Sequence, residues 1–277
     1  MKIYLMTDIE GVAGVLDHKN WCSPDSRNYE TAKEFLTMEA NAAIEGFFEG
    51  GATAIVVADG HGPGAINVKL LDPRVEIMRW WPPGPWPLGL DRSFDAIAWV
   101  GQHAKSGTAR SHLAHTQGFA YLDLSINGIS IGEFGQLAMC ASELGVRAIF
   151  AAGEKALALE AKKLVPGIET VAVKRGLNTS FGDKLTTEEY RELNKAAIHL
   201  HPVKARELIR AGARRAVERA QREKFGIIRL KAPFRRVIAL RPDAENPRRI
   251  SRTMHPKSVI ALMNSPTNFK AVQRNNI

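Results

Sequence analysis

The sequence predicts an α/β fold, with a mixed, largely parallel sheet flanked by helices and a smaller C-terminal α+β lobe. Strand-like and helix-like apolar periodicities alternate through the first 175 residues, which is typical of a sheet covered by helices. Beyond that point the pattern changes to long helical segments and short β-like runs. The length of 277 residues fits one large domain with a small one. We therefore predict an α/β domain over residues 1–190 and a smaller, basic α+β lobe over residues 191–277.

The N-terminal segments predict strands of a parallel sheet and one long helix. Residues 28–48 carry apolar side chains at helical spacing, and Gly50-Gly51 follows as a stop signal. Short, fully apolar runs bounded by polar residues are typical of buried strands. These predicted strands are residues 3–6, 54–58 and 96–100.

The middle of the chain adds an antiparallel hairpin. Residues 121–131 alternate apolar and polar side chains around Asn127-Gly128, a dipeptide that favours a two-residue hairpin turn. The periodicity then predicts helices at residues 134–144 and 154–165 and strands at residues 147–152 and 170–174.

The last third of the chain predicts the smaller lobe. Residues 186–223 are mostly helical in pattern, with a break at Pro202. Three β-like runs follow, at residues 226–230, 236–240 and 258–263. Helices followed by short strands indicate an α+β arrangement.

A loop rich in tryptophan and proline interrupts this pattern at residues 80–87. Its prolines lack the amide donors that a central strand or helix needs, so we expect a rigid loop. Three large aromatic side chains, Trp80, Trp81 and Trp86, are costly to leave in water. We expect them to pack against the body of the protein, an oligomer partner or a substrate.

The composition excludes a disordered or fibrous protein, because 45% of the residues are hydrophobic and 24% are charged. Two cysteines, Cys22 and Cys140, are too few for a disulfide framework and are expected to be reduced thiols. The first apolar run is too short for a signal peptide, and no segment is long enough to cross a bilayer. We expect a soluble cytoplasmic protein.

The formal net charge of +9 comes from the last third of the chain. Residues 1–200 hold 19 Lys and Arg against 24 Asp and Glu, whereas residues 201–277 hold 19 against 5. The arginines of a predicted helix over residues 203–224 fall mostly on one side. We interpret this side as a solvated face, and binding of nucleic acid or another polyanion is the alternative.

Side chains that can bind metals follow several predicted strands. They are Asp8 and Glu10 after the first strand, His61 after the second, His103 after the third and Glu133 after the hairpin. Ligands of open α/β sheets bind outside the carboxyl ends of the strands. Carboxylates and imidazoles suit zinc or manganese. One metal would use three of these residues, whereas five with a bridging carboxylate suit two metals, as in many hydrolases.

Each of these residues also has a structural interpretation. A carboxylate could cap a turn, a histidine could be a satisfied loop residue, and Glu133 could be favourable at a helix N-terminus. Other chemistries have weaker signals. The glycine-rich turns at residues 11–14 and 60–64 match neither the dinucleotide fingerprint nor the P-loop. There is no G-x-S-x-G nucleophile elbow, and Cys140 lies in an apolar helical pattern.

A series of short motifs occurs in one order over residues 1–180. These are Asp8-Ile9-Glu10-Gly11, Arg27-Asn28-Tyr29-Glu30, Met38-x-Ala40-Asn41, Asp59-Gly60-His61, Gly101-x-His103-Ala104, His115 and Gly132-Glu133-Phe134-Gly135. Together they resemble the DppA-type D-aminopeptidases, a family of zinc metallopeptidases. The resemblance implies two zinc ions per chain, and Mn²⁺ or another divalent ion is the alternative.

The resemblance also implies a role for each candidate residue. Asp8 would bridge the two metals, Glu10 and His61 would complete one site, and His103 and Glu133 would complete the other.

One further histidine receives a catalytic role from the resemblance. His115 would act in the chemical step as a base or a nucleophile, whereas the neighbouring His112 is expected to be structural or solvent-facing. The implied activity is hydrolysis of the N-terminal peptide bond of short peptides that contain D-amino acids. The implied assembly is a homo-oligomer, a decamer of two stacked pentamers.

Two other function classes stay open at this point. A metal-dependent phosphoesterase, or another amidase, could use the same metals and loop histidines. A polyanion-binding protein could use the basic C-terminal region. Metal content, substrate profiling and the salt dependence of nucleic-acid binding distinguish these hypotheses.

Overall fold

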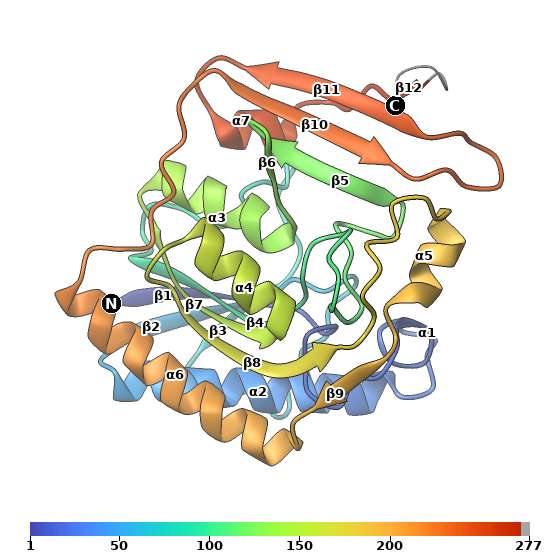
Figure 1. Cartoon of the computed structure of the whole chain (residues 1–277). Coiled ribbons are helices and arrows are strands. Elements are labelled where there is room, and N and C mark those ends of the chain that lie inside the picture. The colour runs from blue at the N-terminus through green and yellow to red at the C-terminus, as the bar shows by residue number, and fades with distance from the viewer. Residues whose placement is uncertain (273–277) are drawn as a thin grey trace.

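The computed structural model describes residues 1–272, in which a seven-stranded sheet lies between helices and next to a five-stranded antiparallel sheet (Figure 1). The strands of the large sheet are, in spatial order, β3 (Glu76–Met78), β2 (Ala54–Asp59), β1 (Lys2–Thr7), β4 (Ala96–Gln102), β7 (Arg147–Glu154), β8 (Glu169–Gly176) and β9 (Ala197–His199). Neighbouring strands are parallel except at the edge, where β9 runs antiparallel to β8. The predicted mixed, largely parallel sheet flanked by helices is confirmed.

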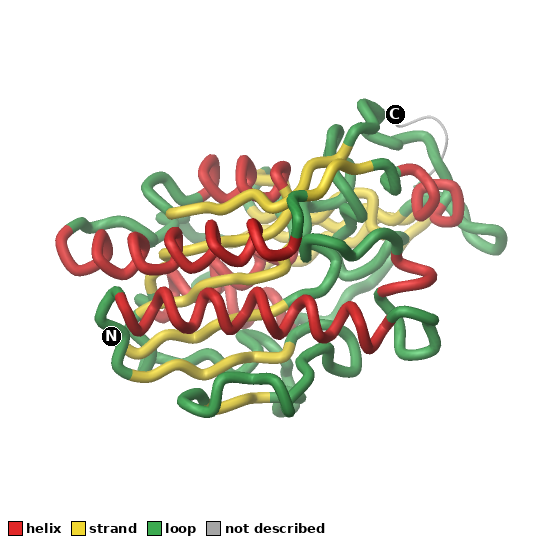
Figure 2. Tube along the Cα trace, turned by 90° about the horizontal axis from the view of Figure 1, so that it is seen from below, coloured by secondary structure: helices red, strands yellow, loops and turns green. Residues whose placement is uncertain are grey.

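Helices cover both faces of this sheet. The covering helices are α2 (Tyr29–Glu49) and α6 (Pro202–Arg222) on one face, and α3 (Glu133–Leu144) and α4 (Lys155–Leu164) on the other. Alternate residues of β1 enter different cores, because side chains of a strand point to opposite faces. Ile3 and Leu5 pack with α2 and α6, whereas Tyr4 and Met6 pack with α3 and α4. Figure 2 shows the two long helices side by side across the strands.

The second sheet covers the outer side of α3. Its strands are, in spatial order, β12 (Lys270–Ala271), β11 (Arg249–His255), β10 (Phe234–Leu240), β5 (Tyr121–Ile126) and β6 (Ile129–Ser130). The β5–β6 hairpin turns at Asn127 and Gly128, whose φ angles of 51° and 80° fit the predicted two-residue turn. Leu124 and Ile238 pack in a third core with Leu262 of α7 (Val259–Asn264). This sheet joins strands from both sides of residue 190, and the division there stays a prediction.

Two of the predicted β-like runs are not strands. Residues 226–230 are irregular, because the Gly226 carbonyl accepts from Ala148 N and Ile228 N donates to the Ser142 hydroxyl, instead of joining a ladder. Residues 258–263 lie in α7 and its N-cap, because the Ser258 side chain accepts from Ala261 N and caps a helix.

Four strands were missing from the prediction, namely β3, β9, β11 and β12. β3 and β12 are only three and two residues long, too short for a periodic pattern. β11 was not predicted because its sequence is mostly polar, and only part of one face of the strand is buried. β9 is three residues long and lies inside the segment predicted as helical, between α5 (Thr187–Leu193) and α6.

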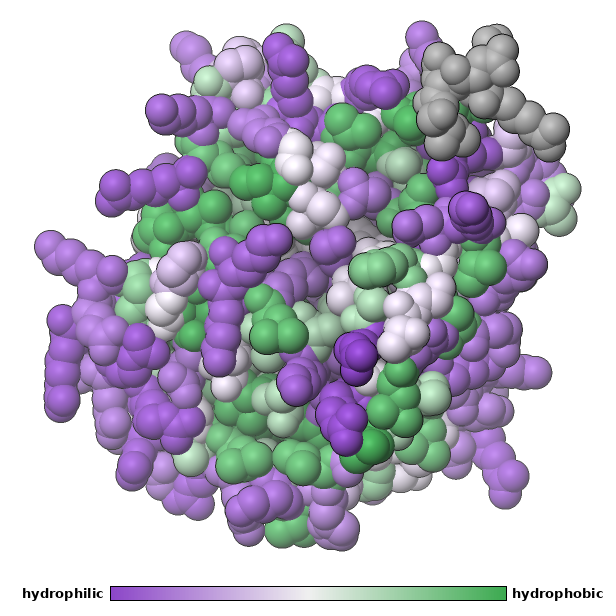
Figure 3. All heavy atoms as spheres, in the orientation of Figure 1, coloured by the Kyte–Doolittle hydropathy of each residue, from purple (hydrophilic) through white to green (hydrophobic). Residues whose placement is uncertain are grey.

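The basic helix α6 is largely neutralised by neighbouring acids. Arg210 pairs with Glu49 of α2, and Nη2 of Arg215 lies 2.8 Å from Oε1 of Glu169. Figure 3 shows hydrophilic side chains projecting along the left edge of the molecule, where α6 lies in Figure 1. These ion pairs agree with the interpretation of a solvated face.

The structure also bears on the two cysteines and on membrane insertion. Cys22 and Cys140 are both buried and free, as expected of reduced thiols. Across residues 1–272, none of the helices combines the length and the apolar character needed to cross a bilayer.

Candidate metal centre

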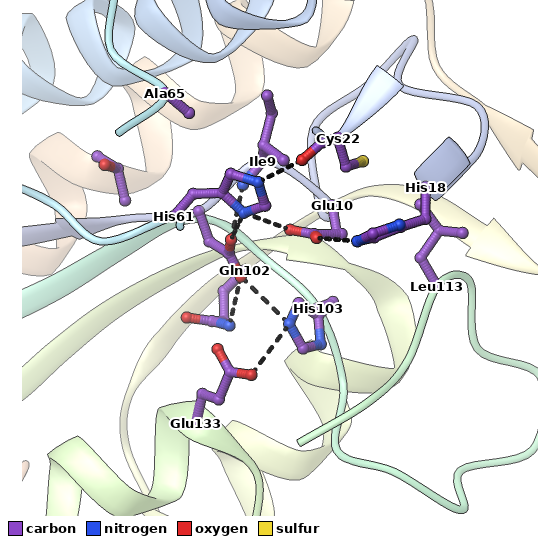
Figure 4. Close-up of polar contacts among 12 residues, drawn as sticks. Ile9, Glu10, His18, Cys22, His61, Ala65, Gln102, His103, Leu113 and Glu133 are labelled. Atoms are coloured by element: carbon purple, nitrogen blue, oxygen red, sulfur yellow. Dashed lines mark hydrogen bonds and ion pairs between the residues drawn. The ribbon is translucent and has the colours of Figure 1, made fainter. Parts of the chain in front are cut away.

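The five predicted metal ligands come together at the carboxyl edge of the large sheet. Asp8 and Glu10 follow β1, His61 follows β2, His103 follows β4, and Glu133 is the first residue of α3. Figure 4 shows the side chains of Glu10, His61, His103 and Glu133 directed toward one another. Parallel strands end at the same edge, so residues far apart in the sequence become neighbours there.

A close backbone approach holds the loops after β1 and β4 together. Gly11 N donates to the Gly101 carbonyl at 2.6 Å, and Asp8 N donates to the Val100 carbonyl at 3.0 Å. Gly101 has a φ of 75°, and a Cβ there would lie 1.9 Å from the Asp8 carbonyl oxygen. Glycine is therefore required at position 101 by both conformation and space.

Asp8 lies between two imidazoles. Its Oδ1 is 3.1 Å from His61 Nδ1, and its Oδ2 is 3.2 Å from His103 Nε2. Glu10 Oε2 also lies 3.1 Å from His61 Nδ1, and Glu133 Oε1 lies 3.7 Å from His103 Nε2. The carboxylates and imidazoles thus form two groups that share Asp8.

The other nitrogen of each imidazole is already used. His61 Nε2 donates to the Cys22 carbonyl at 2.7 Å, and His103 Nδ1 donates to the Ala104 carbonyl at 2.9 Å. When both imidazoles are neutral, His61 Nδ1 and His103 Nε2 carry lone pairs that point at carboxylate oxygens. Both partners of each contact are then hydrogen-bond acceptors. His103 Nε2 is buried and has no hydrogen-bond partner. A cation satisfies such a cluster, and N–H donation to a backbone carbonyl is the usual way to orient a ligating histidine.

The carboxylates perturb the ionisation of this cluster. Burial alone would lower the pKa of His61 and of His103, but the charges of Glu10 and Glu133, together with Asp8, raise both pKa values well above normal. Burial alone would raise the pKa of Asp8, but the close contacts with the imidazoles of His103 and His61 hold it well below its usual range. The site therefore attracts positive charge.

Two residues beside the ligands had no predicted role. Gln102 Nε2 donates to Asp8 Oδ2 at 2.9 Å and so fixes the shared carboxylate. His18 Nε2 lies 4.0 Å from Glu10 Oε1. Gln102 directly precedes His103 at a strand end, which is a usable signal, whereas His18 belongs to a short helix, α1 (His18–Trp21), whose sequence has no such mark.

His115 lies beside the ligands, in the connection between β4 and β5. Its Nε2 is 3.8 Å from Glu133 Oε1, and its ring stacks on that of His103 with centroids 3.9 Å apart. Nδ1 donates to the Leu113 carbonyl at 2.8 Å, which leaves Nε2 free. Burial and the nearby charge of His103 lower the pKa of His115. Ligand atoms of His103, His115 and Glu133 lie within 4.8 Å of one another, so His115 is also close enough to bind a metal.

His112 lies apart from this cluster. Its Nε2 donates to the Leu16 carbonyl at 3.0 Å, and its ring packs edge-on against that of His199. His112 is fully buried and does not line the cavity beside the candidate ligands. Burial lowers the pKa of His112 to about 2. These contacts agree with the structural role expected for His112.

The candidate ligands open into a cavity of about 580 Å³, within the usual range for small-molecule sites. Trp81, Trp86, Trp99 and Leu137 form much of its apolar lining. Trp81 and Trp86 are half-buried there, whereas Trp80 is 70% exposed. Two of the three tryptophans in the proline-rich loop thus contact the body of the protein and face the cavity.

Comparisons with known proteins agree with this geometry. A family model described as D-aminopeptidase matches residues 1–246. A D-aminopeptidase of Bacillus subtilis (strain 168) is 31% identical over 182 residues, which cover 65% of this chain and 66% of that relative, slightly under two thirds of its length. The chain has the fold of a solved structure described as Zn-dependent D-aminopeptidase DppA from Bacillus subtilis, a self-compartmentalizing protease. The TM-score is 0.79 at 23% identity, covering 95% of this chain and 94% of that one.

Proposed function

The chain belongs to the D-aminopeptidase family, as its motifs predicted, and we propose that it is a metal-dependent aminopeptidase that removes the first residue of short peptides at a dinuclear zinc site. The family and the fold support this activity. The single observation that carries it is that the Asp8 carboxylate lies between the ring nitrogens of His61 and His103. Two metals that share one carboxylate satisfy such an arrangement of neutral imidazoles and carboxylates.

The proposed ligand assignment follows from the contacts. Glu10, His61 and Asp8 would hold one ion, and His103, Glu133 and the same Asp8 would hold the other. When bound, two such ions polarise a scissile carbonyl and lower the pKa of a water molecule. The backbone carbonyls that accept from His61 and His103 keep both imidazoles in the ligating tautomer.

We propose that His115 moves a proton during peptide cleavage. Its Nε2 is free, its other nitrogen is held by the Leu113 carbonyl, and the ligand set is complete without it. Its ring lies in the cavity lining next to Glu133. A positioned histidine of this kind accepts or donates a proton at the reacting centre, as a general base or acid.

Several finer points belong to the same proposal. The preference for D-residues and the decameric assembly rest on the family resemblance, and the solved neighbour is described as self-compartmentalizing. Manganese or another divalent ion is the alternative metal, and a cytoplasmic location is the expected one. A phosphoesterase activity is the competing reaction that the same ligands could support.

One experiment tests the activity and the role of His115 together. We expect the purified zinc-loaded protein to cleave D-dipeptides faster than matched L-dipeptides and to leave phosphate esters intact. His115→Ala should keep its metal content and fold but lose about 10²-fold or more in kcat. His112→Ala is the matched control, because that histidine lies outside the cavity, and it should lose much less.

Each result has a distinct meaning. Normal turnover by His115→Ala, or loss of metal together with activity, would contradict the role of His115. Cleavage of L-peptides or phosphate esters alone would contradict the substrate assignment and leave the metal site standing. Full activity after complete removal of metal would contradict the metal-dependent reaction itself.

A further inference from the structure

The cavity lining contains one arginine or lysine within residues 1–272, and this is Arg191 of helix α5. Every other ionisable lining residue is a carboxylate or histidine of the metal centre or of its immediate surroundings. The proposed metal ligands do not use Arg191. We therefore ask which group of a bound substrate its positive charge could contact.

The structure holds α5 firmly at the cavity. The preceding residue, Tyr190, is fully buried, and its hydroxyl accepts from Gly107 N at 2.9 Å. The guanidinium of Arg241 lies 3.6 Å from the centroid of the Tyr190 ring. Thr186 and Glu189 form a capping box at the N-terminus of the same helix. These contacts fix the backbone that carries Arg191.

Arg191 is placed one aromatic ring away from the proposed catalytic histidine. Its guanidinium lies 5.4 Å from the centroid of the Phe119 ring, in the range of a cation–π contact. The ring of Phe119 in turn lies 4.9 Å from that of His115 and 5.2 Å from that of His18. The aromatic contact limits where the guanidinium can point.

Arg191 has no acidic partner among the described residues. No carboxylate lies within ion-pair distance of it, and no hydrogen bond uses its guanidinium, in contrast to Arg210 and Arg215 of α6. An arginine presents parallel N–H donors that match a carboxylate. Its free donors at a substrate cavity suit a carboxylate that arrives with the ligand.

We propose that Arg191 binds the C-terminal carboxylate of the substrate, which makes the enzyme selective for short peptides with a free C-terminus. This inference rests on the proposed aminopeptidase activity. Arg191 is the one permanently charged cationic side chain of the described cavity lining, and its paired N–H donors match a carboxylate. A longer peptide places its carboxylate elsewhere and loses this contact.

The test compares three substrates on the zinc-loaded enzyme. They are D-alanyl-D-alanine, its C-terminal amide, and the amide of D-alanyl-D-glutamate, which moves the negative charge to a side chain. We expect the wild-type protein to prefer the free acid over both amides by about tenfold or more in kcat/KM, the scale of one charge-assisted contact at a solvent-accessible site.

Variants assign the preference to one side chain. Arg191→Gln should lower kcat/KM for the free acid about tenfold, mainly through KM, and should change the value for the alanyl amide less than about twofold. Arg191→Lys should recover part of the loss, because it restores charge without the paired donors. Arg175→Gln is the matched control, because Arg175 is exposed on β8, has no ion pair among the described residues and does not line the cavity.

The outcomes separate this inference from the proposed function. An equal loss on acid and amide in Arg191→Gln, or no acid preference in the wild type, would overturn the inference while the aminopeptidase activity stands. Equal cleavage of the free acid and the glutamate amide would overturn the assignment to the C-terminus. A wild-type protein that cleaves none of the three peptides would overturn both.

Discussion

Replacing Glu39 by Gln should change how the stability of this protein depends on pH. Glu39 lies on the buried side of α2, where its Oε1 accepts from Ala13 N at 2.9 Å and its Oε2 has no hydrogen-bond partner. Burial raises the pKa of this carboxyl to about 7 from its ordinary 4.5, although the Ala13 amide and the charges of Lys174 and Arg206 act in the opposite direction.

The sign of the effect follows from proton binding. Below about pH 4.5 the carboxyl is protonated in both the folded and the unfolded chain. Between the two pKa values the folded chain keeps a proton that the unfolded chain has lost, so folding becomes less favourable as the pH rises toward 7. At about 1.4 kcal/mol per pH unit, the loss approaches about 3 kcal/mol of unfolding free energy by pH 8.

Gln does not titrate in this range, so the difference in unfolding free energy between Glu39→Gln and the wild type should rise by about 3 kcal/mol from pH 4.5 to 8. The amide NH₂ of Gln would lie where Glu39 Oε2 now lies without a hydrogen-bond partner, which lowers stability at every pH. The test therefore uses the change of unfolding free energy with pH and not its absolute value. Urea unfolding at several pH values and one protein concentration gives this slope.

A matched control separates burial from the loss of a charge on the helix. Glu34 lies on the exposed side of α2, and Glu34→Gln should run parallel to the wild type across the whole pH range. Parallel curves for Glu39→Gln and the wild type would refute the reasoning. A slope of the opposite sign would mean that ionised Glu39 is stabilised in the folded chain, with Lys174 and Arg206 as the candidate cations.

Three further predictions follow from the site and the packing. Asp8→Asn should lose both metals in elemental analysis, because one carboxylate contacts both imidazole groups, and retention of one full equivalent would contradict the shared role. Light scattering should give a homo-oligomer larger than a dimer, and a monomer near 30.5 kDa at working concentration would exclude it. Gly46→Ala should lower the thermal midpoint by the equivalent of about 2 kcal/mol, because its Cβ would lie 2.2 Å from the Arg210 carbonyl oxygen of α6. An unchanged thermal midpoint would mean that α2 and α6 can move apart to admit the methyl group without loss of stability.

Local patterns in the sequence determined most of the large sheet and its helices. Fully apolar runs such as Ala96 to Val100 become central strands because both faces of a parallel sheet are covered, which leaves little room for another interpretation. The hairpin at Asn127-Gly128 was equally predictable, because few residues adopt positive φ at two successive positions. Where burial is partial, as in β11, the periodicity weakens and the prediction fails.

The candidate ligands were predictable for a related reason. The ends of parallel strands are recognisable in the sequence and lie at one edge of the sheet, so a polar residue after each strand is a usable signal. Asp8, His61 and His103 all carry it. Only the tertiary structure decides which lone pair faces which carboxylate, because the backbone carbonyls of Cys22 and Ala104 set the two tautomers.

The rest of the cavity lining could not be predicted from the sequence. Phe119 and Arg191 lie 72 positions apart on a loop and a short helix, and neither position carries a periodic signal. Their contact depends on how α5 docks through Tyr190 onto Gly107 and Arg241. Local sequence therefore determined the strands and the ligands at their ends, where hydrogen-bonding geometry and burial act over a few residues. The packing of distant loops decided the cavity wall, because such contacts depend on the summed geometry of the whole chain.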